Sequence, residues 1–190
     1  MGKRSAGSFE RNKGDFYRTW HPATVAPLAR RLGAGAAFVE PCAGDRILAH
    51  NLETMGLQCL FASDVEPQDR SVGIWDAMDL TPELLAGWLP TQVHRLKIIT
   101  NPPWTRTLLH RMIAHFQEIA DTWLLFDADW AHTDQAIPLL ESCHEIIGVG
   151  RVKWMEGSRH SGKDNAAWYN FDARRRRSTH GPVFVNGRVK

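Results

Sequence analysis

Five short apolar segments, each ending on a polar cluster and most of them separated by helix-like sequence, organise this 190-residue chain. Alternation of strands with helices predicts a parallel α/β sheet. The apolar segments are Ala36–Val39, Gln58–Ser63, Val72–Trp75, Leu96–Thr100 and Thr122–Phe126. Because such sheets bind ligands beyond the carboxyl ends of their strands, the polar clusters predict one active site along one sheet edge. The clusters are Glu40–Asp45, Asp64–Glu66, Asp76, Asn101–Trp104 and Asp127–Trp130.

Apolar residues at helical spacing predict helices between these strands. The predicted helices are Thr24–Leu32, a segment from Ile47 to Met55, one that begins at Thr81-Pro82, Leu108–Ile119 and Ala136–Glu141. Two later segments, Ile146–Trp154 and Ala167–Phe171, can pair with each other as strands. We therefore expect one α/β domain with a mostly parallel twisted sheet, helices on both faces and an antiparallel C-terminal hairpin.

Composition sets the expected boundaries of this domain. Residues 1–14 are basic and poor in apolar side chains, which predicts a flexible N-terminus. The domain is expected to span residues 15–172, and residues 173–190 are expected to form a basic tail. We find no internal repeat and no second domain in the sequence.

Cysteine and histidine usage argues against a disulfide framework and against a metal site. The chain has three scattered cysteines without a CxxC pair, and its nine histidines show no HExxH spacing. The N-terminus lacks the apolar region of a signal peptide, and no apolar run is long enough to span a membrane. These features predict a cytoplasmic protein without a bound metal.

Basic residues cluster near both ends of a chain whose formal net charge is +2. Arg174–Arg177 form a run of four arginines, and Lys3, Arg4, Arg11, Lys13 and Arg18 make the N-terminal part basic. Such runs are often solvated surface segments, but they also suit contacts with phosphates. On charge alone the two interpretations stay open.

The turn from Glu40 to Arg46 joins a predicted strand to a predicted helix and contains Gly44. Glycine permits close approach of the backbone to a ligand, and a helix N-terminus offers free N–H groups. Asp64, at the end of the next strand, could bind ribose hydroxyls as acids do in dinucleotide sites. Tight turns of this kind occur in many α/β proteins, so this pattern alone is a weak signal.

Asn101-Pro102-Pro103-Trp104 follows the fourth predicted strand and is more specific. Two prolines stiffen the chain, remove two N–H donors and push Asn101 into extended geometry. This turn leaves the Asn101 side chain and nearby carbonyls as fixed acceptors, with the flat ring of Trp104 beside them. Such an arrangement suits a planar ligand that carries an NH2 group.

Together these motifs resemble those of a known family. Glu40-Pro41-Cys42-Ala43-Gly44-Asp45 looks like the cofactor motif of class I S-adenosylmethionine-dependent methyltransferases, and Asn101–Trp104 looks like the catalytic motif of DNA adenine-N6 enzymes. Asp15–Thr19 resembles the N-terminal motif of the family, and the segment from Glu156 to Tyr169 is similar to that of compact phage- or prophage-type enzymes. The resemblance implies a Rossmann-like methyltransferase domain that uses S-adenosylmethionine and acts on DNA.

The resemblance also implies roles for individual residues. Asn101 and the Pro102 carbonyl would accept hydrogen bonds from the target amine, and Trp104 would stack on the flipped base. The implied catalytic residues are Asn101, Pro102, Pro103 and Trp104. The implied cofactor contacts are Asp15, Tyr17, Thr19, Glu40, Pro41, Cys42, Ala43, Gly44, Asp64, Val65, Asp76 and Asn101, with Asp79 competing for the place of Asp76. Candidate substrate contacts are Trp130, Ser158, Lys163, Trp168, Arg174 and Arg175.

The sequence departs from the pattern of the family at two positions, because Arg46 stands where glycine is frequent and Cys42 replaces the first glycine. One alternative is therefore a non-catalytic nucleic-acid-binding protein on a methyltransferase fold. Another is an enzyme that methylates RNA or a protein glutamine, since the Asn101–Trp104 turn suits any planar amine or amide. The short chain also predicts weak sequence specificity, with recognition by the Glu156–Lys163 loop and the basic tail.

Overall fold

The structure is a computed structural model that describes residues 17–88, 96–154, 162–175 and 181–188. Its sheet has eight strands in the order β3-β2-β1-β4-β5-β7-β6-β8. The strands are β1 (Ala37–Glu40), β2 (Gln58–Asp64), β3 (Gly73–Ile74), β4 (Lys97–Thr100), β5 (Asp121–Asp127), β6 (Cys143–Arg151), β7 (Asn165–Phe171) and β8 (Val183–Asn186). The helices are α1 (Pro22–Leu32), α2 (Ile47–Glu53), α3 (Pro82–Trp88), α4 (Arg106–Ile119) and α5 (Ile137–Leu140).

Strands β1 to β5 pair in parallel, whereas β7 lies antiparallel to both β5 and β6. The predicted mostly parallel sheet with an antiparallel C-terminal part is therefore confirmed. The chain runs outward from β1 to β3 and then returns to place β4 on the other side of β1. This reversal makes the β1–β4 boundary a topological switch point, where α/β sheets bind ligands.

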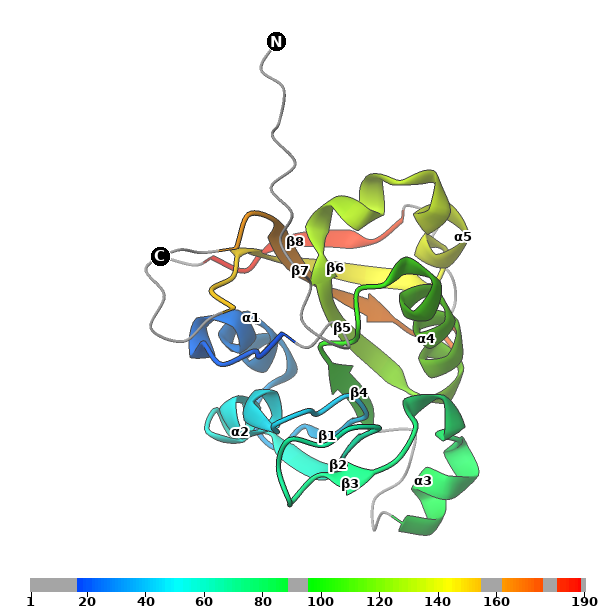
Figure 1. Cartoon of the computed structure of the whole chain (residues 1–190). Helices are drawn as coiled ribbons and strands as arrows, with labels where there is room; N and C mark the ends of the chain where they lie inside the picture. Colours follow the sequence, from blue (N-terminus) through cyan, green and yellow to red (C-terminus); the bar gives the residue numbers. More distant parts are fainter. Residues whose placement is uncertain (1–16, 89–95, 155–161, 176–180, 189–190) are drawn as a thin grey trace.

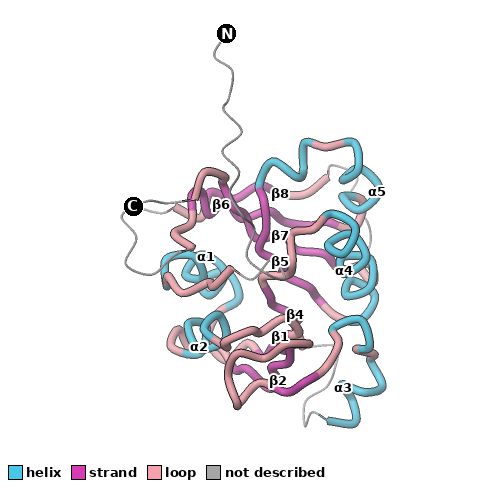
Figure 2. The backbone as a smooth tube through the Cα atoms, viewed as in Figure 1, coloured by secondary structure: helices cyan, strands magenta, loops and turns pink. Residues whose placement is uncertain are grey.

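Helices cover both faces of the sheet, as expected: α1 and α2 lie on one side, and α3, α4 and α5 lie on the other (Figures 1 and 2). Successive side chains of a strand point to opposite faces. Val39 and Ile98 accordingly pack with the core under α4, while Phe38 and Ile99 pack with the core under α1 and α2. Two apolar cores thus fix the strands that carry the predicted polar clusters.

The C-terminal part differs in detail from the sequence-based expectation. The first strand of the hairpin begins at Cys143 and ends at Arg151, three residues earlier at each end than Ile146–Trp154. Val183–Asn186 lies within the predicted basic tail, residues 173–190, but forms β8 and pairs in parallel with β6. All four residues of β8 are exposed, so no burial pattern marks this strand in the sequence.

Within the described ranges, no helix has the length and apolar character needed to cross a membrane. The predicted flexible residues 1–14 lie outside the described residues.

Candidate active site

A cavity of about 520 Å³ opens at the carboxyl ends of β1, β2 and β4. It combines residues from motifs that are far apart in the sequence, as expected for the edge of a parallel sheet at a switch point. The sequence-predicted residues that line it are Tyr17, Thr19, Glu40, Pro41, Cys42, Ala43, Asp64, Val65, Asp76, Asn101 and Pro103. The fold therefore places the Glu40–Asp45 turn and the Asn101 corner in one shared cavity.

The turn after β1 is tight because two residues adopt left-handed backbone conformations. Gly44 has φ 50° and Arg46 has φ 64°. The backbone N–H of Gly44 donates to Oδ2 of Asp64 over 2.9 Å, which ties this turn to the end of β2. Arg46 thus occupies the left-handed region without being glycine, and its guanidinium pairs with Glu53 at 2.9 Å. The turn therefore keeps its left-handed conformation at position 46 with arginine in place of the glycine that is frequent in the family.

Glu40 carries a buried carboxyl group against the cavity. It is 1% exposed, and its Oε2 accepts a hydrogen bond from the N–H of Ala49 over 3.0 Å. Burial raises the pKa of Glu40 well above its ordinary value, against the lowering effect of that hydrogen bond. A cationic ligand in the cavity would reverse this effect by stabilising the carboxylate.

Two further acids stand at the ends of neighbouring strands. Asp64 accepts backbone hydrogen bonds from Gly44 and Glu66, each at 2.9 Å. Asp76 accepts from the N–H of Met78 over 2.8 Å and lines the cavity. Asp79, the competing choice, does not line the cavity. Each carboxylate oxygen keeps a lone pair for a further donor such as a hydroxyl group.

The side chain of Asn101 is held by three hydrogen bonds. Its Nδ2 donates to the carbonyl of Tyr17 over 2.8 Å and to Oγ1 of Thr19 over 3.2 Å. Its Oδ1 accepts from Nε1 of Trp104 over 3.0 Å. Because an indole N–H only donates and a carbonyl only accepts, these partners fix which end of the amide faces which way.

Trp104 is partly buried and does not line the cavity. Its ring and that of Trp154 form a T-shaped pair with centroids 5.4 Å apart, and its N–H donates to Asn101. Pro103 lines the cavity, and Pro102 is buried. The sequence predicted that the Trp104 ring lies beside Asn101, but it did not predict the hydrogen bond between the two side chains.

Most of the proposed substrate contacts lie elsewhere. Trp130 and Trp168, predicted as substrate contacts, are fully buried and do not line the cavity, so neither ring is accessible to a substrate in this structure. Trp130 packs against Phe126 and Tyr169, and Trp168 donates to the Thr24 carbonyl. Lys163, Arg174 and Arg175 are exposed but outside the cavity, and Arg174 pairs with Asp172. Asp15 and Ser158 lie outside the described residues.

Several residues that line the cavity were not predicted from the sequence as site residues. Arg18 pairs with Asp45, and both side chains line the cavity. Arg111 and Met112 come from α4, the helix that follows the Asn101 corner. Their position just after a predicted catalytic motif was the only available signal, because an amphipathic helix gives no indication of which residues near its start face a ligand.

Cys42 also lines the cavity, two residues after the end of β1. Burial raises the pKa of its thiol, and the nearby Asp64 carboxylate acts in the same direction. A neutral thiol is a poor nucleophile. This environment argues against a covalent role for Cys42.

The sequence matches no protein-family model and no curated protein. Solved structures are similar in fold. A protein assigned as an RNA methyltransferase from Pyrococcus horikoshii aligns with a TM-score of 0.60 at 14% identity, over 84% of this chain and 88% of that one. A protein assigned as a class I S-adenosylmethionine-dependent methyltransferase from Listeria monocytogenes aligns at 0.50 and 10% identity, over 93% and 67%.

The methyltransferase subunit of a type I restriction-modification system from Streptococcus thermophilus aligns with a TM-score of 0.54 at 10% identity, over 90% of this chain. The chain spans about half of that subunit, 47% of its length. These similarities, together with the strand order and the switch-point cavity, show that the chain has the Rossmann-like fold of class I S-adenosylmethionine-dependent methyltransferases.

Proposed function

We propose that this protein transfers a methyl group from S-adenosylmethionine to an exocyclic amino group of a nucleic-acid base, and that its substrate is adenine N6 in DNA. The observation that carries the proposal is the shared cavity, in which the buried carboxyl of Glu40 lies with Asp64, Asp76 and Asn101. Its volume of about 520 Å³ lies within the usual range of small-molecule sites.

The donor set of the cavity fits the cofactor. S-adenosylmethionine carries a sulfonium and an ammonium group, and a buried carboxyl group such as Glu40 is stabilised in its ionised form by a nearby cation. Asp64 and Asp76 stand where their free lone pairs can accept hydrogen bonds from hydroxyl and amino groups of the cofactor. The cofactor supplies an electrophilic methyl group to the target nitrogen.

Asn101 is the residue that would orient this nitrogen. Its Oδ1 accepts one hydrogen bond from Trp104 and keeps a second lone pair for the target NH2 group. The Pro102 carbonyl would accept the other N–H. These acceptors hold the nitrogen lone pair toward the methyl group and stabilise the positive charge that develops on nitrogen. One proton then leaves the methylated nitrogen for solvent.

A methyl-transfer assay tests this function. Radiolabelled S-adenosylmethionine is incubated separately with DNA, RNA and protein, and the intact protein is compared with Asn101→Ala. We expect label in adenine N6 of DNA, and a loss of about two orders of magnitude or more for the variant, as is typical when a preorganised stabilising group is removed. Calorimetry measures the affinity of the variant for S-adenosylmethionine separately, so that a loss of transfer at saturating cofactor can be assigned to the target amine.

RNA is the second candidate substrate, since one of the similar structures is assigned as an RNA methyltransferase. Label in RNA alone would replace DNA by RNA in the proposal. Absence of cofactor binding to the intact protein would exclude the enzyme and leave a non-catalytic protein on this fold.

A further inference from the structure

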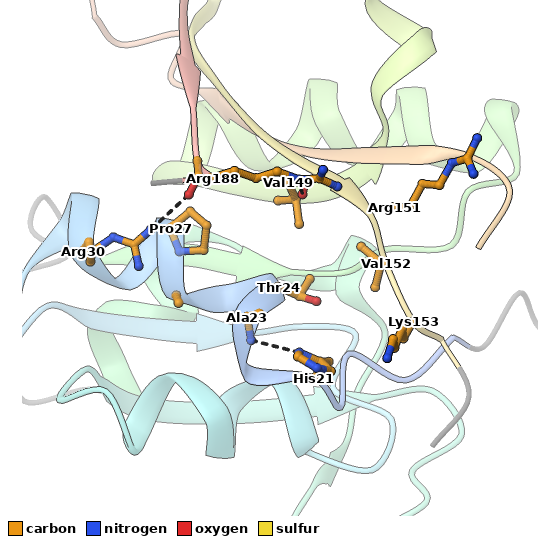
Figure 3. Close-up of a pocket in the computed structure, with 12 residues that line it drawn as sticks. His21, Ala23, Thr24, Pro27, Arg30, Val149, Arg151, Val152, Lys153 and Arg188 are labelled. Atoms are coloured by element: carbon orange, nitrogen blue, oxygen red, sulfur yellow. Dashed lines mark hydrogen bonds between the residues drawn. The ribbon is translucent and has the colours of Figure 1, made fainter. Parts of the chain in front are cut away.

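A second cavity, of about 380 Å³, lies between α1 and β6 (Figure 3). We refer to this cavity as the α1–β6 groove. Five of its twelve lining residues are basic or histidine, and none is acidic. They are His21, Arg30, Arg151, Lys153 and Arg188. A concave surface lined by charges of one sign concentrates oppositely charged ligands.

No acidic residue among those that the structure describes pairs with these charges. Arg30 donates to the carbonyl of Gly187 over 3.0 Å, and Arg188 donates to the carbonyl of Val149 over 3.0 Å, so both guanidinium groups contact neutral acceptors. Arg151 and Lys153 are exposed and form no ion pair with the described part of the chain. By contrast, the neighbouring Arg31 is paired with Glu145.

The backbone is shaped to hold Arg188 in place. Gly150 of β6 has φ 83°, and a Cβ atom at this position would lie 1.8 Å from a guanidinium nitrogen of Arg188. The absence of a side chain therefore lets the guanidinium lie across β6. Figure 3 shows Arg30 and Arg188 toward one end of α1 and His21 with Lys153 toward the other.

The groove leads toward the candidate active site. Because β5 and β6 are both antiparallel to β7, they run in the same direction and end at the same sheet edge. Lys153 follows the end of β6, and the next residue, Trp154, packs against Trp104 with ring centroids 5.4 Å apart. Trp104 in turn donates to Asn101.

We propose that the α1–β6 groove binds the sugar-phosphate backbone of the polynucleotide strand whose base enters the active site. This inference rests on the proposed function and adds a docking surface to it. Unneutralised cations suit phosphates, and the apolar floor formed by Pro27, Val149 and Val152 suits the sugars. The sequence had pointed instead to the arginine run, where Arg174 is already paired with Asp172.

Fluorescence anisotropy with a short single-stranded adenine-containing DNA tests the groove directly. The double variant Arg151→Gln/Lys153→Gln removes two exposed cations that form no ion pair with the described residues. Because each phosphate contact contributes a salt slope of about 0.7 for single strands, we expect a slope less steep by about 1.4 and binding about ten-fold weaker or more at about 0.1 M salt.

The matched control is Arg70→Gln, which removes an exposed cation from the loop after β2 and should leave affinity and salt slope unchanged. An unchanged slope in the groove variant, or the same loss in the control, overturns the proposal. So does a poly-aspartate peptide that competes as strongly as DNA at equal charge, because the groove would then accept acidic protein segments.

Methyl-transfer kinetics separate this inference from the proposed function. The groove variant should raise KM for the polynucleotide about ten-fold, with kcat and the affinity for S-adenosylmethionine unchanged. A loss in kcat alone would contradict a docking role. If the intact protein methylates no polynucleotide, the proposed function fails, while the anisotropy experiment still decides whether the groove binds the backbone.

Discussion

The indole nitrogen of Trp104 donates a hydrogen bond to Oδ1 of Asn101 over 3.0 Å, across the proline-braced turn that follows β4. The other end of the same amide is held by Tyr17 and Thr19. Trp104 is thereby placed to orient Asn101, whereas the sequence predicted that it would stack on a base. The two roles have different kinetic consequences.

Trp104→Phe keeps an aromatic ring against Trp154 but removes the N–H donor. A hydrogen bond contributes about 1 kcal/mol net, so we expect kcat to fall about five-fold. KM for the polynucleotide should stay unchanged, as measured by steady-state methyl transfer. Trp154→Phe, which leaves the bond to Asn101 intact, is the control. A large rise in KM at constant kcat would instead support stacking on the base.

Glu40→Gln should change how the free energy of unfolding depends on pH. The pKa of Glu40 is raised in the folded state, so the folded protein binds its proton more tightly than the unfolded chain does. Stability from this group is therefore present at low pH and is lost as pH rises from the unfolded value of about 4.5 toward the raised folded value. Urea denaturation should show the variant gaining stability relative to the intact protein as pH rises through that window. Parallel pH curves would contradict this assignment.

The same buried carboxyl predicts a pH dependence of cofactor binding. A cationic ligand favours ionised Glu40, so binding should release a proton and the affinity for S-adenosylmethionine should rise with pH through the raised pKa. Calorimetry in buffers of different ionisation enthalpy measures the released proton. Glu40→Gln should bind more weakly and release none; proton release that persists in the variant would assign it to another group.

The left-handed backbone of Arg46 can be tested with two substitutions that both remove its ion pair with Glu53. Asparagine tolerates this conformation, whereas the β-branched side chain of valine does not. Arg46→Val should be less stable than Arg46→Asn by about 1 kcal/mol or more in urea denaturation. Equal stabilities would mean that this residue is not left-handed in solution.

His110 accepts a hydrogen bond from Nε1 of the buried Trp130 over 2.9 Å, which requires a neutral ring nitrogen. Burial, with Arg106 as a second cause, lowers the pKa of His110 below its ordinary value of 6.5. The folded state therefore binds this proton less tightly, so stability should fall as pH drops below about 6.5. His110→Gln keeps an acceptor that does not titrate and should flatten the curve measured by thermal unfolding. An unchanged curve would exclude His110 as the group responsible.

The succession of strands along the chain up to β5 and the place of the Asn101 corner after the fourth strand could be predicted, because both depend on local patterns. Apolar runs followed by Glu40, Asp64 and Asn101 marked strand ends, and parallel strands bring their ends to one edge. The exposed edge strand β8 could not be predicted, since its four residues carry no burial pattern and gain their partner only from β6.

The sequence alone thus determined the alternation of elements, the polar residues at each strand end and the stiff turn after β4. Only the tertiary structure decided which rings are buried, as Trp168 shows by donating to Thr24, 144 residues away. It also decided that the α1–β6 groove exists, because its cations come from three segments that meet only after the sheet has formed. Periodicity is encoded among neighbours in sequence, whereas burial and charge convergence depend on contacts between distant segments.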